Sequence, residues 1–320
     1  MEDAHATILD LDGNGDQNNA FFAVYDGHGG SATAKFAGQN VHKRLTSEES
    51  YKEKNYKTAL KKAFLGTDQD LLADKGRDAS GCTAIAALLT NDNKIYVANA
   101  GDSRSVIGIQ GKAKDLSSDH KPTNYSERER ITAAGGKVVG RRVEADLALS
   151  RALGDFKYKK NASLGPEAQI ITANPDVTCH QITEEDEFLV LACDGIWECL
   201  SSQQVVNYIR YQVSVGKELP EICEMLFELC LAPSTYWYQT GTDNMTLIIV
   251  AITHGRTEKE WYEWVTERVK AGCGYKTPST SPSLYPDSKL AGFRARRKVY
   301  EERERLKNLE RLKNSEPAEC

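Results

Sequence analysis

Short apolar runs separated by turn residues fill the chain up to about residue 255. Seven of these runs have the length of a β-strand: residues 4–11, 20–25, 83–89, 94–100, 104–110, 188–192 and 245–253. The turn Asp12-Gly13-Asn14-Gly15 joins the first two runs, and Asn91-Asp92-Asn93 joins the third to the fourth. Because turns this tight connect antiparallel neighbours, the pattern predicts hairpins and a meander.

Apolar residues recur at helical spacing in five other stretches. These are residues 31–45, 56–73, 126–134, 203–213 and 220–231. Ser126 followed by Glu129 forms a capping box, and Gly135-Gly136 supplies the end of that helix. Long helices grouped between sets of strands favour antiparallel sheets covered by helices over a regular parallel βαβ array. We therefore predict an α+β fold.

The chain changes character beyond residue 275. Residues 276–288 combine three prolines with serines and threonines, which is typical of a linker. Residues 289–320 are dense in charge and carry a thin apolar stripe, which predicts a charged helical or disordered tail, with a partner-binding helix as the alternative. The predicted divisions are a main domain over residues 1–256, a helix packed on or near it over 257–275, the linker and the tail.

The composition is that of a soluble globular protein. The 320 residues carry 41 Lys and Arg against 46 Asp and Glu, a formal charge of -5, and 40% are hydrophobic. No apolar run approaches the roughly 18–20 residues that cross a bilayer, and acids stand where a secretory signal needs basic residues. We expect a monomer in the cytoplasm or nucleus, without a membrane partner. The mild acidity argues against nucleic acid as a partner.

Several familiar site motifs are absent or incomplete. The eight cysteines form no Cys-x-x-Cys pair and are too dilute for a disulfide scaffold. Residues 12–16 imitate the start of a calcium loop, but Gln17 and Ala23 stand where that loop needs Gly and Glu. The sequence has no nucleophile elbow, no P-loop and no His-Glu-x-x-His motif. Serine-hydrolase, P-loop, kinase and zinc-protease chemistry therefore lose support.

Aspartates stand at the ends of four apolar strands. Asp26 and Asp194 each follow a strand and precede a glycine, Asp102 follows the strand 94–100, and Asp243 precedes the strand 245–253. Each alone could cap a turn or helix, but aspartate is a poor strand residue and four such placements need another reason.

A cluster of carboxylates has to bind protons or cations. Two carboxylates about 4 Å apart repel by roughly 4 kcal/mol at an effective dielectric constant of 20. Oxygen ligands without Cys or His suit Mg²⁺ or Mn²⁺, and a glycine such as Gly27 lets its own backbone carbonyl approach an ion. Two such ions about 3.5–4 Å apart can clamp a phosphoryl group during in-line attack.

Seven short motifs follow one another along the chain. They are Met1-Glu2-Asp3-Ala4-His5, Phe22-Ala23-Val24-Tyr25-Asp26-Gly27-His28-Gly29-Gly30, Ser80-Gly81-Cys82-Thr83-Ala84, Asn99-Ala100-Gly101-Asp102-Ser103-Arg104, Leu149-Ser150-Arg151-Ala152-Leu153-Gly154-Asp155, Ala192-Cys193-Asp194-Gly195-Ile196-Trp197 and Gly241-Thr242-Asp243-Asn244-Met245-Thr246. In kind and order they resemble the motifs of the metal-dependent protein serine/threonine phosphatases, the type 2C or PPM family. The resemblance covers about residues 1–255 and leaves the tail outside.

This resemblance implies a four-layer α-β-β-α sandwich with a binuclear Mn²⁺ or Mg²⁺ site at one end. By motif, Asp26 would bridge both metals and the Gly27 carbonyl would bind one of them. The other implied positions are Asp194 and Asp243 on the second metal, Glu2 and Asp3 on metal-bound waters, and Asp102 on a weaker third metal.

The resemblance also implies the reaction. The chain would be a hydrolase acting on phosphoprotein substrates in signalling, with residues 1–256 as its catalytic domain. A hydroxide bridging the metals would attack the phosphorus of phosphoserine or phosphothreonine without a phosphoenzyme. His28 would protonate the leaving alkoxide, a general-acid role worth typically about 10²–10⁴-fold.

The sequence departs from the family pattern in two places. The family usually has a strand and a phosphate-binding Arg upstream of the Met1 motif, and we expect both to be lacking. Arg141, Arg142 and Arg151 are then candidates for phosphate binding by charge alone. Glu198 stands where the family usually has Asp, at the third-metal position, and its longer side chain shifts the carboxylate by about one methylene.

Two other functions remain open from the sequence alone. A truncated or pseudophosphatase acting as a binding or regulatory module is motivated by the missing strand and Arg. A two-metal nuclease is disfavoured by the acidic charge balance. The physiological substrate does not follow from the residues.

Overall fold

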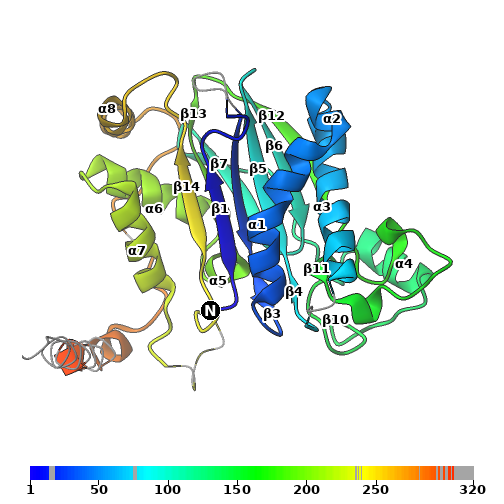
Figure 1. Ribbon diagram of the computed structural model, residues 1–320. Coiled ribbons are helices and arrows are strands. Elements are labelled where there is room, and N and C mark those ends of the chain that lie inside the picture. The colour runs from blue at the N-terminus through cyan, green and yellow to red at the C-terminus, as the bar shows by residue number, and fades with distance from the viewer. Residues whose placement is uncertain are drawn as a thin grey trace, which may run out of the picture.

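The computed structural model describes residues 1–13, 19–74, 78–234, 240–280 and 282–292, and the single residues 236, 238, 295, 298, 299, 302, 303 and 305. Within these residues, two antiparallel sheets pack face to face and helices cover both outer faces (Figure 1). The predicted α+β four-layer sandwich is confirmed. Part of the predicted turn at residues 12–15 and the tail residues 306–320 lie outside the described residues.

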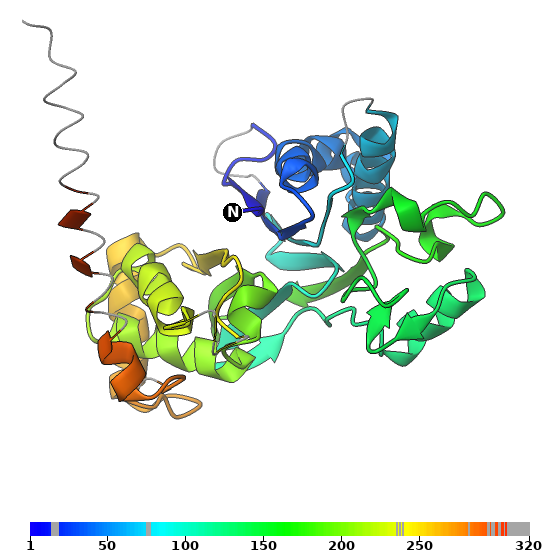
Figure 2. The same ribbon diagram turned by 90° about the horizontal axis from the view of Figure 1, so that it is seen from below.

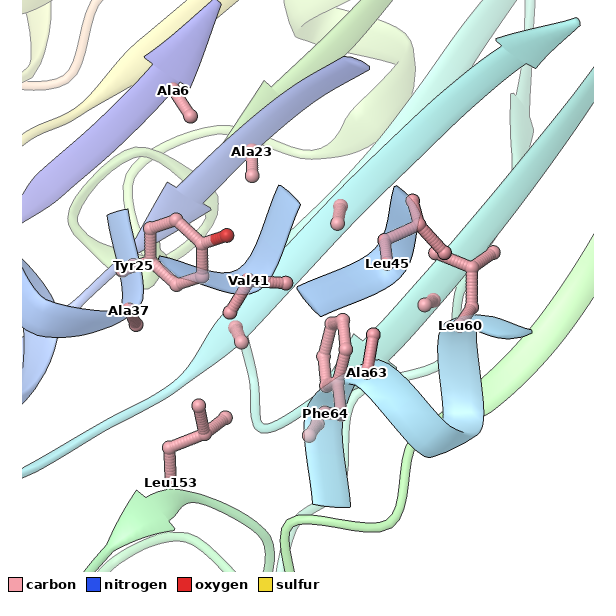
Figure 3. Packing of buried hydrophobic residues seen from close by; sticks show 14 of the residues in the cluster. Ala6, Ala23, Tyr25, Ala37, Val41, Leu45, Leu60, Ala63, Phe64 and Leu153 are labelled. Carbon is pink, nitrogen blue, oxygen red and sulfur yellow. The ribbon is translucent and has the colours of Figure 1, made fainter. Parts of the chain in front are cut away.

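The first sheet has the strand order β1-β2-β5-β6-β12 within the described residues. Its strands are β1 (Ala4–Ile8), β2 (Ala20–Tyr25), β5 (Ala84–Thr90), β6 (Lys94–Ala100) and β12 (Asp176–Gln181). Helices α1 (Ala32–Ser47) and α3 (Tyr56–Ala73) cover its outer face. Along β2, Ala23 and Tyr25 face these helices (Figure 3). Phe22 and Val24 face the other sheet. This alternation is the two-residue period of a strand buried on both sides.

The second sheet has the order β14-β13-β7-β8 in the described part of the chain. Its strands are β7 (Arg104–Ile109), β8 (Lys112–Asp115), β13 (Asp186–Ala192) and β14 (Leu247–Ala251). Its outer face carries α6 (Ser202–Ser214), α7 (Leu219–Cys230) and α8 (Glu258–Lys270). Phe188 and Val190 of β13 pack under these helices, and Leu189 and Leu191 pack against the first sheet.

Short elements gather at the end of the sandwich where the chain begins. These are β3 (Gly27–His28), β4 (Gly81–Cys82), β11 (Leu153–Gly154) and α5 (Asp194–Trp197). In Figure 1 the N-terminus, β3, α5 and the start of β14 all lie at this end. Helix α2 (Glu49–Lys52) links α1 to α3 at the opposite end.

A separate projection lies between β8 and β12. It holds α4 (Tyr125–Ala133), β9 (Val138–Val139), β10 (Arg142–Val143) and the 3₁₀ turns Phe156–Tyr158 and Pro166–Ala168. Ile131, Val143 and Leu149 belong to its own small core. Figure 2 shows this part extending away from the sheets on the side of α3.

The segment predicted as a linker, residues 276–288, lies against the second sheet's helices. Leu284 packs against their apolar cluster, and Tyr285 is only 5% exposed. Residues 287–292 are helical. No helix within the described residues combines the length and apolar character needed to cross a bilayer.

A buried carboxylate ties α6 and α8 to β13. Glu187 is fully buried, and its Oε1 accepts hydrogen bonds from Arg210 Nη2 at 3.1 Å and from Arg268 Nε at 3.0 Å. Burial raises the pKa of Glu187 in spite of the two guanidinium groups. Arg210 is itself 1% exposed, so neither partner has water as an alternative.

Replacing Glu187 by glutamine should lower the free energy of unfolding by about 3–5 kcal/mol, because it leaves a buried guanidinium without its countercharge. Urea denaturation measures this change. The matched control is Glu263→Gln, which breaks the exposed pair with Lys259 on α8 and should cost less than about 1 kcal/mol. Equal losses in the two variants would contradict a stabilising role for the buried pair.

Candidate metal centre

Strand register brings the predicted aspartates to one end of the sandwich. Ala4 of β1 pairs with Tyr25 of β2. Because Asp3 precedes Ala4 and Asp26 follows Tyr25, the antiparallel register sets Asp3 beside Asp26. The pairing of Ala192 with Leu247 likewise brings the start of α5, which carries Asp194, towards the residues that precede β14. Antiparallel neighbours therefore deliver side chains from distant parts of the chain to the same edge.

Hydrogen bonds lock these segments together. The Glu2 amide donates to Asn244 Oδ1 at 2.6 Å, and the Thr246 hydroxyl donates to Asp3 Oδ2 at 2.6 Å. A side chain at Gly27 would overlap the Glu2 carbonyl, and one at Gly195 would overlap the Asn244 carbonyl. Both glycines are thus needed for the close approach of backbone to backbone at this end.

Burial and neighbouring carboxylate charges raise the pKa values of Asp26 and Asp194. Burial raises the pKa of Asp26 to about 9, helped by the charges of Asp194, Asp3, Asp102 and Asp243. Burial also raises the pKa of Asp194 to about 7, with Asp102 and Glu198 adding to the shift and Lys121 opposing it. Excess negative charge is therefore concentrated at this end of the molecule.

The donor set fits a hard divalent cation. Asp3 Oδ1 is buried and has no hydrogen-bond partner within the described residues. The neighbouring side-chain donors are carboxylate oxygens, which Mg²⁺ and Mn²⁺ prefer, and a cation would relieve the repulsion that raises the pKa of Asp26. The side chains are not closed around an ion: in the described part of the chain, no three or more His, Cys, Asp or Glu residues converge tightly enough to hold one.

Lys121 neutralises Asp102, the residue implied for a third metal. Asp102 is 3% exposed, and its Oδ2 lies 2.5 Å from Lys121 Nζ. The neighbouring His120 fixes the turn, because its amide donates to the Gly101 carbonyl and its Nδ1 accepts from the Gly101 amide. Sequence reasoning missed Lys121, since nothing in its local pattern links it to a carboxylate nineteen positions earlier.

His28 contacts a second residue that the sequence did not assign. Its Nε2 lies 2.7 Å from Asp155 Oδ2, and the Asp155 side chain is 4% exposed. A side chain at Gly81 would overlap both groups, which explains the glycine at this position of β4. The motif ending at Asp155 was visible in the sequence, but only the fold shows that this carboxylate holds the histidine ring.

A cleft of about 560 Å³ opens beside Asp194. Its charged lining consists of Arg104, Asp119, Lys121, Arg141, Arg142, Asp194 and Glu198, and Arg104 is paired with Asp119 at 2.9 Å. Arg151, the third arginine considered for phosphate binding, instead pairs with Glu127 and Asp176 and is absent from the residues that line this cleft. Arg141 and Arg142 therefore stand next to the acidic cluster, whereas Lys121 is paired with Asp102 inside it.

Comparisons with known proteins agree on one family. A family model described as protein phosphatase 2C matches residues 1–236. A protein named "Protein phosphatase 2C homolog 2" from Aspergillus fumigatus is 49% identical, covering 91% of this chain and 70% of its own length. Its namesake from Schizosaccharomyces pombe is 48% identical, covering 92% and 80%. The crystal structure of a phosphatase from Toxoplasma gondii superposes with a TM-score of 0.66 at 26% identity, covering 80% of this chain and 90% of that one.

The stability of the metal-free protein should fall as the pH rises from about 4 to about 9. Asp26 and Asp194 have folded-state pKa values above the ordinary value of 3.8, so the native state binds more protons than the unfolded state in this range. The free energy of unfolding then decreases by at most about 1.4 kcal/mol per pH unit for each group. Urea denaturation in the presence of EDTA across this range measures the decrease.

Asp26→Asn should reduce this pH dependence, most clearly between about pH 7 and 9 where Asp194 no longer contributes, whereas Asp92→Asn should not. Asp92 lies in the turn after β5, where Lys94 lowers its pKa, so it does not share the effect. Saturating Mn²⁺ should restore the stability of the wild-type protein at high pH. A metal-free wild-type protein with constant stability over the range would contradict the clustering of charge.

Proposed function

Because this chain belongs to the protein phosphatase 2C family and is therefore a metal-dependent protein serine/threonine phosphatase, we propose that it hydrolyses phosphoserine and phosphothreonine monoesters at a binuclear Mn²⁺ or Mg²⁺ site. The observation that carries the proposal is the cluster of aspartates around Asp26, whose pKa is raised to about 9 by burial and by the neighbouring carboxylate charges. Such a cluster at a strand end is costly without cations and is suited to holding them.

The proposed ligands come from five separated segments. Asp26 and the Gly27 carbonyl would hold ions on one side of the site, and Asp194 and Asp243 would hold them on the other. The remaining proposed contacts are Glu2 and Asp3 through water, and Asp102 with Glu198 at a weaker third ion. The ion pair of Lys121 with Asp102 supports this last site being the weakest, because an ion there would have to compete with a tethered ammonium group.

Bound ions would supply a lowered pKa for a water molecule and would neutralise charge on the phosphoryl oxygens. The chain's own contribution begins with Asp26, Asp194 and Asp243, which orient the site. His28 then gives a proton to the serine or threonine oxygen as it leaves. The 2.7 Å contact with Asp155 holds the imidazole ring in one orientation for this transfer.

Substrate binding is proposed to use the cleft beside Asp194. Arg141 and Arg142 line this cleft, together with Arg104 and Lys121, which are already paired with Asp119 and Asp102. Guanidinium groups bind phosphate oxygens through paired, charge-assisted hydrogen bonds, so a phosphorylated segment is drawn towards the acidic cluster that processes it. The alternative of a pseudophosphatase that only binds is not favoured, because the carboxylates proposed as ligands are present.

Asp194→Asn should abolish metal-dependent phosphate release from a phosphoserine peptide. The loss should be at least about hundredfold, because removing one anionic ligand weakens an interaction worth several kcal/mol in the transition state. Asp92→Asn removes the same charge from a distant turn and should keep wild-type turnover. Wild-type turnover by Asp194→Asn at saturating Mn²⁺ would exclude the proposed mechanism.

His28→Gln should lower the turnover of a phosphoserine peptide by about 10²–10⁴-fold. Its effect on an aryl phosphate should be far smaller, because an aryl oxide leaves as a stable anion and needs no proton. Steady-state kinetics on both substrates test this difference, with His42→Gln on α1 as the control. Equal losses on the two substrates would show that His28 does not act as a general acid.

A further inference from the structure

Asp243 differs from the other carboxylates at the site in how it is held. It is exposed, and it lies on the loop that connects α7 to β14. Its Oδ1 accepts a hydrogen bond from the neighbouring Asn244 amide at 2.7 Å, which is a contact within the loop itself. The position of this carboxylate therefore depends on how the backbone of the loop is fixed to the rest of the domain.

The loop closes on itself at a narrow neck. The Ala232 amide donates to the Gly241 carbonyl at 2.8 Å, so the chain leaves α7 and returns to almost the same place. Gly241 has a φ of +77°, and a side chain there would overlap the Cys230 carbonyl and the Tyr285 hydroxyl. Asp243 follows two residues after this neck.

The Tyr285 hydroxyl contacts both of the chain segments that form the neck. It donates to the Cys230 carbonyl at 2.7 Å and lies 3.3 Å from the Thr240 carbonyl. Burial raises the pKa of Tyr285 to about 12, so the hydroxyl remains a donor at neutral pH. The ring of Tyr238 packs edge-on against it, with the ring centres 5.0 Å apart.

Tyr285 belongs to a strap, which we define as the described part of residues 273–285. Arg210 anchors its first half by donating to the Cys273 carbonyl at 2.9 Å, the Tyr275 carbonyl at 3.0 Å and the Thr277 hydroxyl at 2.8 Å. Arg210 is in turn paired with the buried Glu187. The strap therefore runs from the buried ion pair of Arg210 with Glu187 to the neck of the Asp243 loop. It lies beyond residues 1–236, which the family model matches.

We propose that Tyr285 is a positioning residue for divalent-ion binding. Its hydroxyl fixes the neck and thereby the carboxylate of Asp243, so that the segment following α8 sets the affinity of the ion held there. This inference rests on the proposed function. Tyr285 touches neither substrate nor reacting atoms and acts only through the loop.

The test is Mn²⁺ titration by calorimetry on Tyr285→Phe in the full chain. The dissociation constant of the ion at Asp243 should rise roughly two- to tenfold, the range that the loss of one net hydrogen bond produces. At saturating Mn²⁺, KM and kcat for a phosphoserine peptide should stay near the wild-type values, because the ring and the assembled site remain.

The matched control is Tyr262→Phe. The Tyr262 hydroxyl accepts from the Leu219 amide at 2.7 Å, so this variant removes one tyrosine hydrogen bond from the other end of α7. Its Mn²⁺ affinity should equal that of the wild-type protein. In an Asp243→Asn background, Tyr285→Phe should cause no further change in Mn²⁺ binding, because the coupled ligand is already absent.

Three results would overturn the inference: unchanged Mn²⁺ binding by Tyr285→Phe, an equal loss in Tyr262→Phe, or a loss that persists with Asp243→Asn. A wild-type chain that binds no Mn²⁺ would instead reject the proposed function. Should Tyr285→Phe fail to fold, Tyr238→Leu removes the ring that packs against Tyr285 and so loosens the hold of the Tyr285 hydroxyl on the neck. Weaker Mn²⁺ binding in that variant supports the inference, and wild-type binding overturns it.

Discussion

Mutual repulsion between clustered carboxylates is the constraint that shapes this molecule. Burial and the charges of Asp194, Asp3, Asp102 and Asp243 together raise the pKa of Asp26, so holding these groups at one end is costly. Loops alone would let such groups drift apart. Here the central strands of the two sheets, such as β2 and β13, are buried on both faces and hold the ends of the segments in place, and the helices outside hold the sheets. Burial of the apolar layers thus offsets the unfavourable free energy of the clustered charges.

Much of the sandwich could be predicted because its central strands and helices carry regular patterns. The bounds predicted for β2 and α3 match the structure. Strand β12 was missed because it is an edge strand with mostly exposed side chains, so its apolar residues do not alternate. The linker composition of residues 276–288 is real, yet composition could not show that Tyr285 is buried against a loop more than forty residues earlier.

The site was predictable to the extent that it depends on strand ends. Aspartates at the ends of apolar strands meet because antiparallel register places those strand ends together. The positions of the aspartates next to the apolar runs can be identified in the sequence. The roles of Asp155 and Lys121 could not be predicted in this way. They depend on single contacts, with His28 across 127 positions and with Asp102 across 19 positions, and such contacts leave no periodic pattern in the sequence. The roles of individual ligands stay predictions, since side chains near one another do not by themselves define coordination.

The projection between β8 and β12 has a small core of its own, to which Ile131, Val143 and Leu149 belong. It also carries Arg141 and Arg142 on the wall of the cleft. Mutations that reshape it can therefore be absorbed locally, without disturbing the sheets that align the acidic cluster. If the cleft binds substrate as proposed, changes in this projection would alter which phosphorylated proteins are accepted while the acidic cluster is inherited unchanged.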